Sequence, residues 1–253
     1  MKSFCLKFNR QLAPILFSLV FAVVPLRADD QMVQPGQPVQ LSDLHYLADG
    51  KPDAIALLAP PPLPDSPEQA ADMAEVQSVF HTAGTNEVAT AFSERKFSVF
   101  NFTSVIGSFF QSNNLPKTTA FFHHVQKQAE SVTDAAKDFY KRPRPYVTDP
   151  SLASGQLEKS FSYPSGHSTE SMVLALVLAD LFPDKRDAII AKARNIGWHR
   201  VEIARHYPTD IYAGRVLAQA IVREMKTSDT FQKDFAEAQA EIASLQKPVA
   251  AGK

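Results

Sequence analysis

The sequence contains a single cysteine, Cys5, so no disulfide within the chain stabilises the fold and no cysteine cluster can hold a metal ion. It also lacks an HExxH motif and a cluster of aspartates. After the first 28 residues no apolar run reaches the roughly 18 residues that a membrane-spanning helix needs. The chain is 45% hydrophobic and 21% charged over 253 residues, which is typical of one globular domain held together by its core.

The first 28 residues have the pattern of a secretory signal peptide. A basic stretch that ends at Arg10 precedes an apolar stretch over residues 12–26, and Ala28 is the expected cleavage point. An N-terminal membrane anchor is the alternative. Cleavage would leave 22 Lys and Arg against 27 Asp and Glu, a net charge of −5, which argues against nucleic acid or an anionic membrane as the main partner. We therefore expect a periplasmic or secreted protein.

Residues 29–65 are rich in proline and turn signals and are predicted to form an extended, partly polyproline-like arm, with a flexible linker as the alternative. Residues 66–253 are predicted to form an α-helical domain. Helices are expected at about 66–83, 86–96, 97–110, 114–140, 165–182, 187–203, 208–226 and 229–245, with a polar loop at 146–162. A strand is the alternative only for 97–110. The predicted fold class is all-α, a single-domain helical bundle.

The segment YPSGHS, residues 163–168, predicts a sharp turn directly before the apolar run 172–182. Ser165 is a candidate N-cap, which would place backbone N–H groups and His167 at the N-terminus of a buried helix. Unpaired N–H groups and the helix dipole favour an anion at such a position. For this motif alone, an ordinary helix start with a surface histidine is the alternative.

Two other clusters contain the residue types that phosphoryl chemistry needs: Lys137 with Arg144, and Arg200 with His206 and Asp210. Cationic side chains and helix N–H donors can surround the oxygens of a phosphoryl group. His206 and Asp210 are four residues apart, so on a helical turn the carboxylate can orient the imidazole and leave its other nitrogen free to attack. His167 can then act as the general acid, which predicts an optimum on the acid side of neutrality.

Each cluster also has a plainer interpretation. The basic residues could be solvated charges, and His206 with Asp210 could be a surface pair or half of a metal site. His199 and the adjacent His123 and His124 leave a zinc or iron hydrolase open, but the arginines close to this site count against a metal. No metal ion and no cofactor are predicted.

In this order, K-x6-RP, PSGH and R-x5-H-x3-D resemble the signature of the type 2 phosphatidic acid phosphatase (PAP2) superfamily. The signature positions are Lys137, Arg144, Pro145, Pro164, Ser165, Gly166, His167, Arg200, His206 and Asp210. Residues 54–63 also resemble a segment that soluble class A bacterial acid phosphatases carry near the mature N-terminus. One departure is His199, because the family often has serine before this arginine.

The resemblance implies a metal-independent acid phosphatase that forms a phosphohistidine on the residue matching His206. Asp210 would orient this histidine, and His167 would protonate the leaving group. The phosphoryl oxygens would be held by Lys137, Arg144, Ser165, the Gly166 N–H and Arg200. The expected partners are small-molecule phosphomonoesters, without nucleic acid or, after signal cleavage, a membrane; a homo-oligomer fits the family tendency. A vanadium-dependent haloperoxidase, a lipid phosphate phosphatase and a non-catalytic phosphate-binding protein remain alternatives.

Overall fold

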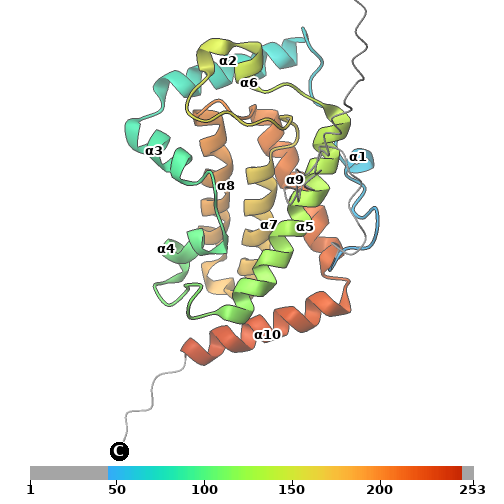
Figure 1. Ribbon diagram of the computed structural model, residues 1–253, viewed down its shortest axis with the longest axis vertical. Helices are drawn as coiled ribbons and strands as arrows, with labels where there is room; N and C mark the ends of the chain where they lie inside the picture. The colour runs from blue at the N-terminus through green and yellow to red at the C-terminus, as the bar shows by residue number, and fades with distance from the viewer. Residues whose placement is uncertain (1–44, 247–253) are drawn as a thin grey trace, which may run out of the picture. The chain divides into compact units, whose positions relative to one another are not determined.

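The computed structural model describes residues 45–246; the predicted signal peptide, residues 29–44 of the arm and residues 247–253 lie outside the described residues. Helices account for all the regular structure of residues 45–246, which contain no strand (Figure 1). The α-helices are α1 (Ala54–Leu57), α2 (Pro67–Thr82), α3 (Thr85–Ser93), α4 (Thr103–Ile106), α5 (Pro116–Tyr140), α6 (Pro145–Thr148), α7 (Gly166–Leu181), α8 (Arg186–Glu202), α9 (Pro208–Met225) and α10 (Asp229–Gln246). For the described residues, the predicted all-α class is confirmed. None of the described helices combines the length and the apolar character needed to cross a membrane.

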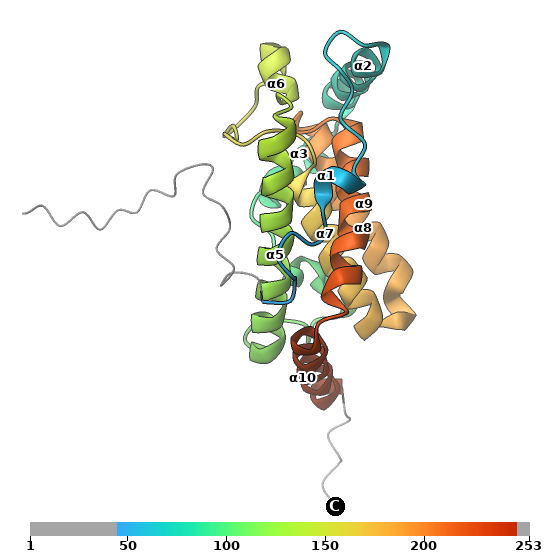
Figure 2. The ribbon, with the colours of Figure 1, turned by 90° about the vertical axis from the view of Figure 1, so that its right-hand side faces the viewer.

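Helix α7 is the centre of the bundle. Most of its residues are buried, as expected for a helix that is apolar all round. It packs against α5, α8 and α9, which lie beside it in both views (Figures 1 and 2). The N-terminus of α7, the C-termini of α5 and α8 and the N-terminus of α9 therefore meet at one end of the bundle.

Small side chains let the helices meet closely at this end. A Cβ atom built on Gly214 of α9 would lie 2.9 Å from the carbonyl oxygen of Ser165, directly before α7. A Cβ atom on Gly197 of α8 would lie 3.2 Å from Ser168 Oγ. The same Ser168 hydroxyl donates to the carbonyl of Ile211 at 2.8 Å, which satisfies a polar group inside this contact. The turn at the start of α7 is thus held against α8 and α9.

Most predicted helix boundaries agree with the structure to within about three residues, and capping residues marked some of them. Ser66 Oγ, for example, accepts from Gln69 N at 3.1 Å at the start of α2. The single helix predicted at 97–110 is wrong: this segment forms a short 3₁₀ turn at Val99–Phe102 and then α4, which ends where Gly107 adopts a φ of 130°. Its buried phenylalanines contribute to the core without helical periodicity. The predicted loop 146–162 also contains most of α6 and a 3₁₀ turn at Pro150–Leu152.

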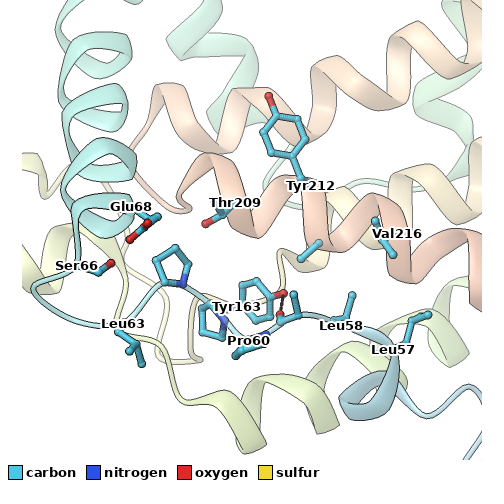
Figure 3. Close-up of a pocket in the computed structure, with 14 residues that line it drawn as sticks. Leu57, Leu58, Pro60, Leu63, Ser66, Glu68, Tyr163, Thr209, Tyr212 and Val216 are labelled. Atoms are coloured by element: carbon cyan, nitrogen blue, oxygen red, sulfur yellow. Dashed lines mark hydrogen bonds between the residues drawn. The ribbon is translucent and has the colours of Figure 1, made fainter.

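The described part of the proline-rich arm, residues 45–65, packs against the helices. The N–H groups of Tyr46 and Leu47 donate to Gln128 Oε1 on α5, at 2.8 and 2.9 Å. Farther along, the Tyr140 hydroxyl donates to the carbonyl of Leu58 at 3.0 Å. Between this arm and α9 lies a mainly apolar groove of about 730 Å³ (Figure 3). None of the predicted site residues lines this groove.

Candidate active site

The first turn of α7 forms one wall of the site. Ser165 is its N-cap, as predicted: its Oγ accepts from Ser168 N at 3.3 Å. The Ser165 N–H donates to the carbonyl of Asp210 at 3.0 Å, which ties this turn to α9. A Cβ atom on Gly166 would lie 3.2 Å from Lys137 Nζ, so glycine lets this ammonium approach the first turn of α7. A cation and a helix N-terminus therefore share one location, which favours an anion.

His206 and Asp210 lie at the start of α9, and both are buried. Asp210 Oδ2 is 3.3 Å from His206 Nδ1 and accepts from Tyr207 N at 2.9 Å and Ser162 Oγ at 2.5 Å. On the other side of the ring, Arg144 Nη1 lies 3.2 Å from His206 Nε2. Since a carboxylate accepts and a guanidinium donates, the hydrogen is on Nδ1 and the lone pair is on Nε2. Burial, reinforced by Arg144, holds the pKa of His206 well below its usual value, so this imidazole is neutral.

Three basic side chains surround this ring. Arg144 is oriented by two carbonyls: its Nε donates to Ser160 O at 2.7 Å and its Nη1 to Arg205 O at 2.9 Å. Arg200 is 1% exposed; burial lowers its pKa to about 10, which leaves it charged at neutral pH. Together with Lys137, these two arginines act electrostatically on His206. They form a positively charged cradle, meaning here Lys137, Arg144, Arg200 and the first turn of α7.

His167, in the first turn of α7, lies at the edge of this cradle. Its Nε2 is 3.1 Å from the carbonyl oxygen of Glu94, and its ring is tilted 39° against Phe97 at 5.3 Å. Burial, followed by the charge of Arg200, lowers the pKa of His167 to about 3. The imidazole is therefore neutral when no anion occupies the cradle. All eight residues predicted for the site are thus brought to one end of the bundle, while their catalytic roles stay predictions.

Known proteins resemble this chain over most of its length. Residues 127–232, which contain all eight residues, match the model of the PAP2 superfamily. This part of the chain is therefore a PAP2 superfamily domain. The chain is 28% identical to a non-specific acid phosphatase of Providencia stuartii, over 90% of this chain and 93% of that protein. Because this likeness to an acid phosphatase extends over most of its length, the chain is a phosphatase.

Other similarities are shorter or more distant. The chain is 47% identical to a lipid A 1-phosphatase of Rhizobium etli over 53 residues, 21% of this chain and 23% of that protein. The solved structure of a transmembrane PAP2-type phosphatidylglycerolphosphate phosphatase from Bacillus subtilis matches with a TM-score of 0.45 and 18% identity. It covers 69% of this chain and 89% of that one.

The cradle also contains a carboxylate that the sequence did not point to. Glu158, in the loop after α6, has Oε2 at 2.5 Å from Arg144 Nη1, and its Oε1 pairs with Arg200 Nη2. Burial of Glu158 opposes ionisation, but the two arginines outweigh it and lower its pKa to about 2. A glutamate in a polar loop has no spacing signal, and only the folded loop places it between the arginines.

A second group that the sequence did not point to, Arg142, contacts the other carboxylate oxygen of Asp210. Arg142 Nη1 donates to Asp210 Oδ1 at 2.6 Å, and its Nη2 donates to Asp72 Oδ2 of α2 at 2.7 Å. All three side chains are buried, so each charge needs its oppositely charged partner to offset the cost of leaving water. Arg142 thus holds Asp210 where its other oxygen can meet His206.

His199, the departure from the superfamily pattern, is not part of the cradle. Its Nδ1 is 2.6 Å from Glu94 Oε2.

On α7, Glu170 follows His167 by one turn, and Gln126 Nε2 donates to its Oε2 at 3.0 Å. Burial raises the pKa of Glu170 to about 7. None of the spacings in the sequence pointed to Glu94 or Glu170.

Proposed function

We propose that this phosphatase hydrolyses phosphomonoesters through a phosphohistidine on His206. One observation carries the proposal: His206 is neutral, its Nδ1 lies beside Asp210, and its Nε2 lies at Arg144 in the basic cradle. This is the geometry of an oriented nucleophile next to a site for a phosphoryl group. A site that only binds phosphate needs the cations but not this histidine and aspartate pair.

In the first step, His206 Nε2 attacks phosphorus, a P–N bond forms and the bond from phosphorus to the leaving oxygen breaks. His167 gives its proton to that oxygen, so the product is a neutral alcohol. In the second step, water gives a proton to His167 while its oxygen attacks phosphorus. The P–N bond then breaks, which releases inorganic phosphate and restores both histidines. Lys137, Arg144, Arg200, Ser165 and the Gly166 N–H bind the phosphoryl oxygens.

His167 becomes protonated when the substrate binds. In the free protein, burial and the charge of Arg200 keep its pKa near 3. A phosphoryl dianion in the cradle adds negative charge beside the ring and raises this pKa. The charged acid is therefore favoured where a leaving group is bound, and more so at acid pH. This gives the predicted optimum below neutrality a physical basis.

The expected substrates are small phosphomonoesters, and the expected location is the periplasm or the exterior. The similarity to a named acid phosphatase over most of the chain supports the substrate class. The signal-like pattern of the first 28 residues supports the location. Phosphohistidine chemistry at these residues requires no metal ion.

The test is p-nitrophenyl phosphate hydrolysis from pH 4 to 8 with EDTA present. His206→Ala should lower kcat by at least about 10³-fold, because it removes the nucleophile. His123→Ala, which removes an exposed histidine on α5, is the matched control and should leave kcat unchanged. Quenching the enzyme during turnover of labelled phosphomonoester should trap phosphate on the wild-type chain but not on His206→Ala.

Three outcomes would overturn the proposal. Loss of activity in EDTA would indicate a metal hydrolase. Vanadate-dependent halide oxidation without phosphatase activity would indicate a haloperoxidase. Hydrolysis confined to lipid phosphates in detergent would replace the substrate class.

A further inference from the structure

Glu94 links the proposed general acid to a different helix. It is the residue that ends α3, and its side chain is 3% exposed. Its backbone carbonyl oxygen is 3.1 Å from His167 Nε2. A carbonyl can only accept, so Nε2 carries a hydrogen and Nδ1 is the nitrogen left to exchange a proton with the leaving group.

The carboxylate of Glu94 is anchored to α8 at two points. His199 Nδ1 lies 2.6 Å from Oε2, and Lys192 Nζ lies 2.8 Å from Oε1. Burial disfavours the charge of Glu94, but hydrogen bonds from His199 and Lys192 outweigh it and lower the pKa of this carboxyl. A buried carboxylate with two charge-assisted partners fixes the backbone that carries it. The position of the Glu94 carbonyl is thus set by α8, the helix that also supplies Arg200 to the cradle.

Building on the proposed function, we propose that Glu94, anchored by His199 and Lys192, is a positioning residue for His167. It holds the ring with hydrogen on Nε2 and with Nδ1 available to the leaving group. This gives His199 a role in the proton-transfer half of the site and none in binding phosphate. Phe97, whose ring centroid is 5.3 Å from that of His167, limits the tilt of the ring but cannot select the tautomer.

The consequence is a dependence on the leaving group. A poor leaving group, such as an alkyl alcohol, needs the proton from a well-placed acid, whereas p-nitrophenolate leaves without one. Misplacing His167 should therefore slow the hydrolysis of alkyl phosphates selectively. The nucleophile His206 and the cradle keep their own contacts, so KM should change little.

The experiment compares kcat/KM for glycerol 1-phosphate and for p-nitrophenyl phosphate in Glu94→Ala. This parameter reports events up to leaving-group departure, so the later hydrolysis of the phosphoenzyme, which both substrates share, does not enter. We expect a loss of about 10- to 100-fold for glycerol phosphate. The loss for p-nitrophenyl phosphate should stay below about 3-fold, since this substrate does not use the acid. Glu94→Gln keeps an acceptor oxygen for His199 and should restore most of the difference. Glu237→Ala, at an exposed ion pair with Lys117, is the matched control.

Equal losses for the two substrates would show that Glu94 has only a structural role and would overturn the proposal, as would no loss. If Glu94→Ala does not fold, His199→Ser and Lys192→Met remove the anchors separately and should show the same selectivity. Independently, ¹⁵N NMR of the histidine rings should show hydrogen on Nε2 of His167 in the wild-type chain; hydrogen on Nδ1 alone would overturn the proposal. His206→Ala keeps the two hypotheses separate: activity that survives this substitution refutes the phosphohistidine mechanism, whatever the Glu94 variants do.

Discussion

Removing the negative charge of Glu158 should improve the binding of phosphate. Its carboxylate pairs with Arg144 and Arg200, the two arginines proposed to bind the phosphoryl group. A phosphate ion must therefore displace Glu158 or share the arginines with it. Glu158→Gln keeps the size of the side chain and weakens this competition.

The size of the effect follows from the pKa of Glu158. The shift from 4.5 to about 2 corresponds to about 3 kcal/mol in favour of the ionised form within the cradle. This is an upper limit, about 300-fold in affinity, because a side chain that is 21% exposed is partly screened by water. We expect the inhibition constant for inorganic phosphate to fall by about 10-fold.

The assay is competitive inhibition of p-nitrophenyl phosphate hydrolysis by phosphate at pH 5, 6 and 7. The low pKa keeps Glu158 ionised at all three values, so its own titration adds no pH dependence to the gain. Because folding lowers the pKa of Glu158, its ionised form also stabilises the fold. This contribution is present above about pH 4.5 and is lost as the pH falls towards 2. Glu237→Gln, an exposed glutamate, is the control. An inhibition constant that rises or stays the same in Glu158→Gln would refute the competition.

Three predictions concern stability. Burial raises the pKa of Glu170 from 4.5 to about 7. Its ionisation therefore destabilises the fold as the pH rises through this range. Glu170→Gln should raise the urea midpoint of unfolding at pH 8 but not at pH 4. Gly214→Ala would place a Cβ atom 2.9 Å from the Ser165 carbonyl oxygen and should lower stability by about 1–3 kcal/mol; an unchanged melting temperature would contradict the close contact. Asp72→Ala leaves Arg142 buried with one carboxylate and should cost about 3 kcal/mol or more in urea unfolding; a cost under about 1 kcal/mol would show that water replaces the partner.

Where the sequence predicted the fold well, a local signal was present. Ser66 before α2 and Ser165 before α7 mark helix starts because a hydroxyl can satisfy an orphan N–H group. In the segment 97–110 the comparable signal, Ser98 with Asn101, starts only a short 3₁₀ turn, and the phenylalanines suit a buried helix or irregular turns equally well. The short turns were decided by packing and by Gly107, whose φ of 130° ends α4.

The sequence by itself determined most of the helices and indicated the residues proposed for the phosphate site, because capping, hydrophobic runs and the three spaced motifs act over a few positions of the chain. Only the tertiary structure decided the surroundings of those residues. Glu158 lies between two arginines, Arg142 between two aspartates, and Glu94 between His167 and His199. These contacts are made by single residues that are mostly far apart in the chain. A single residue has no periodicity or spacing in the sequence from which its contact could be predicted. The residue that it contacts is determined only when the helices pack.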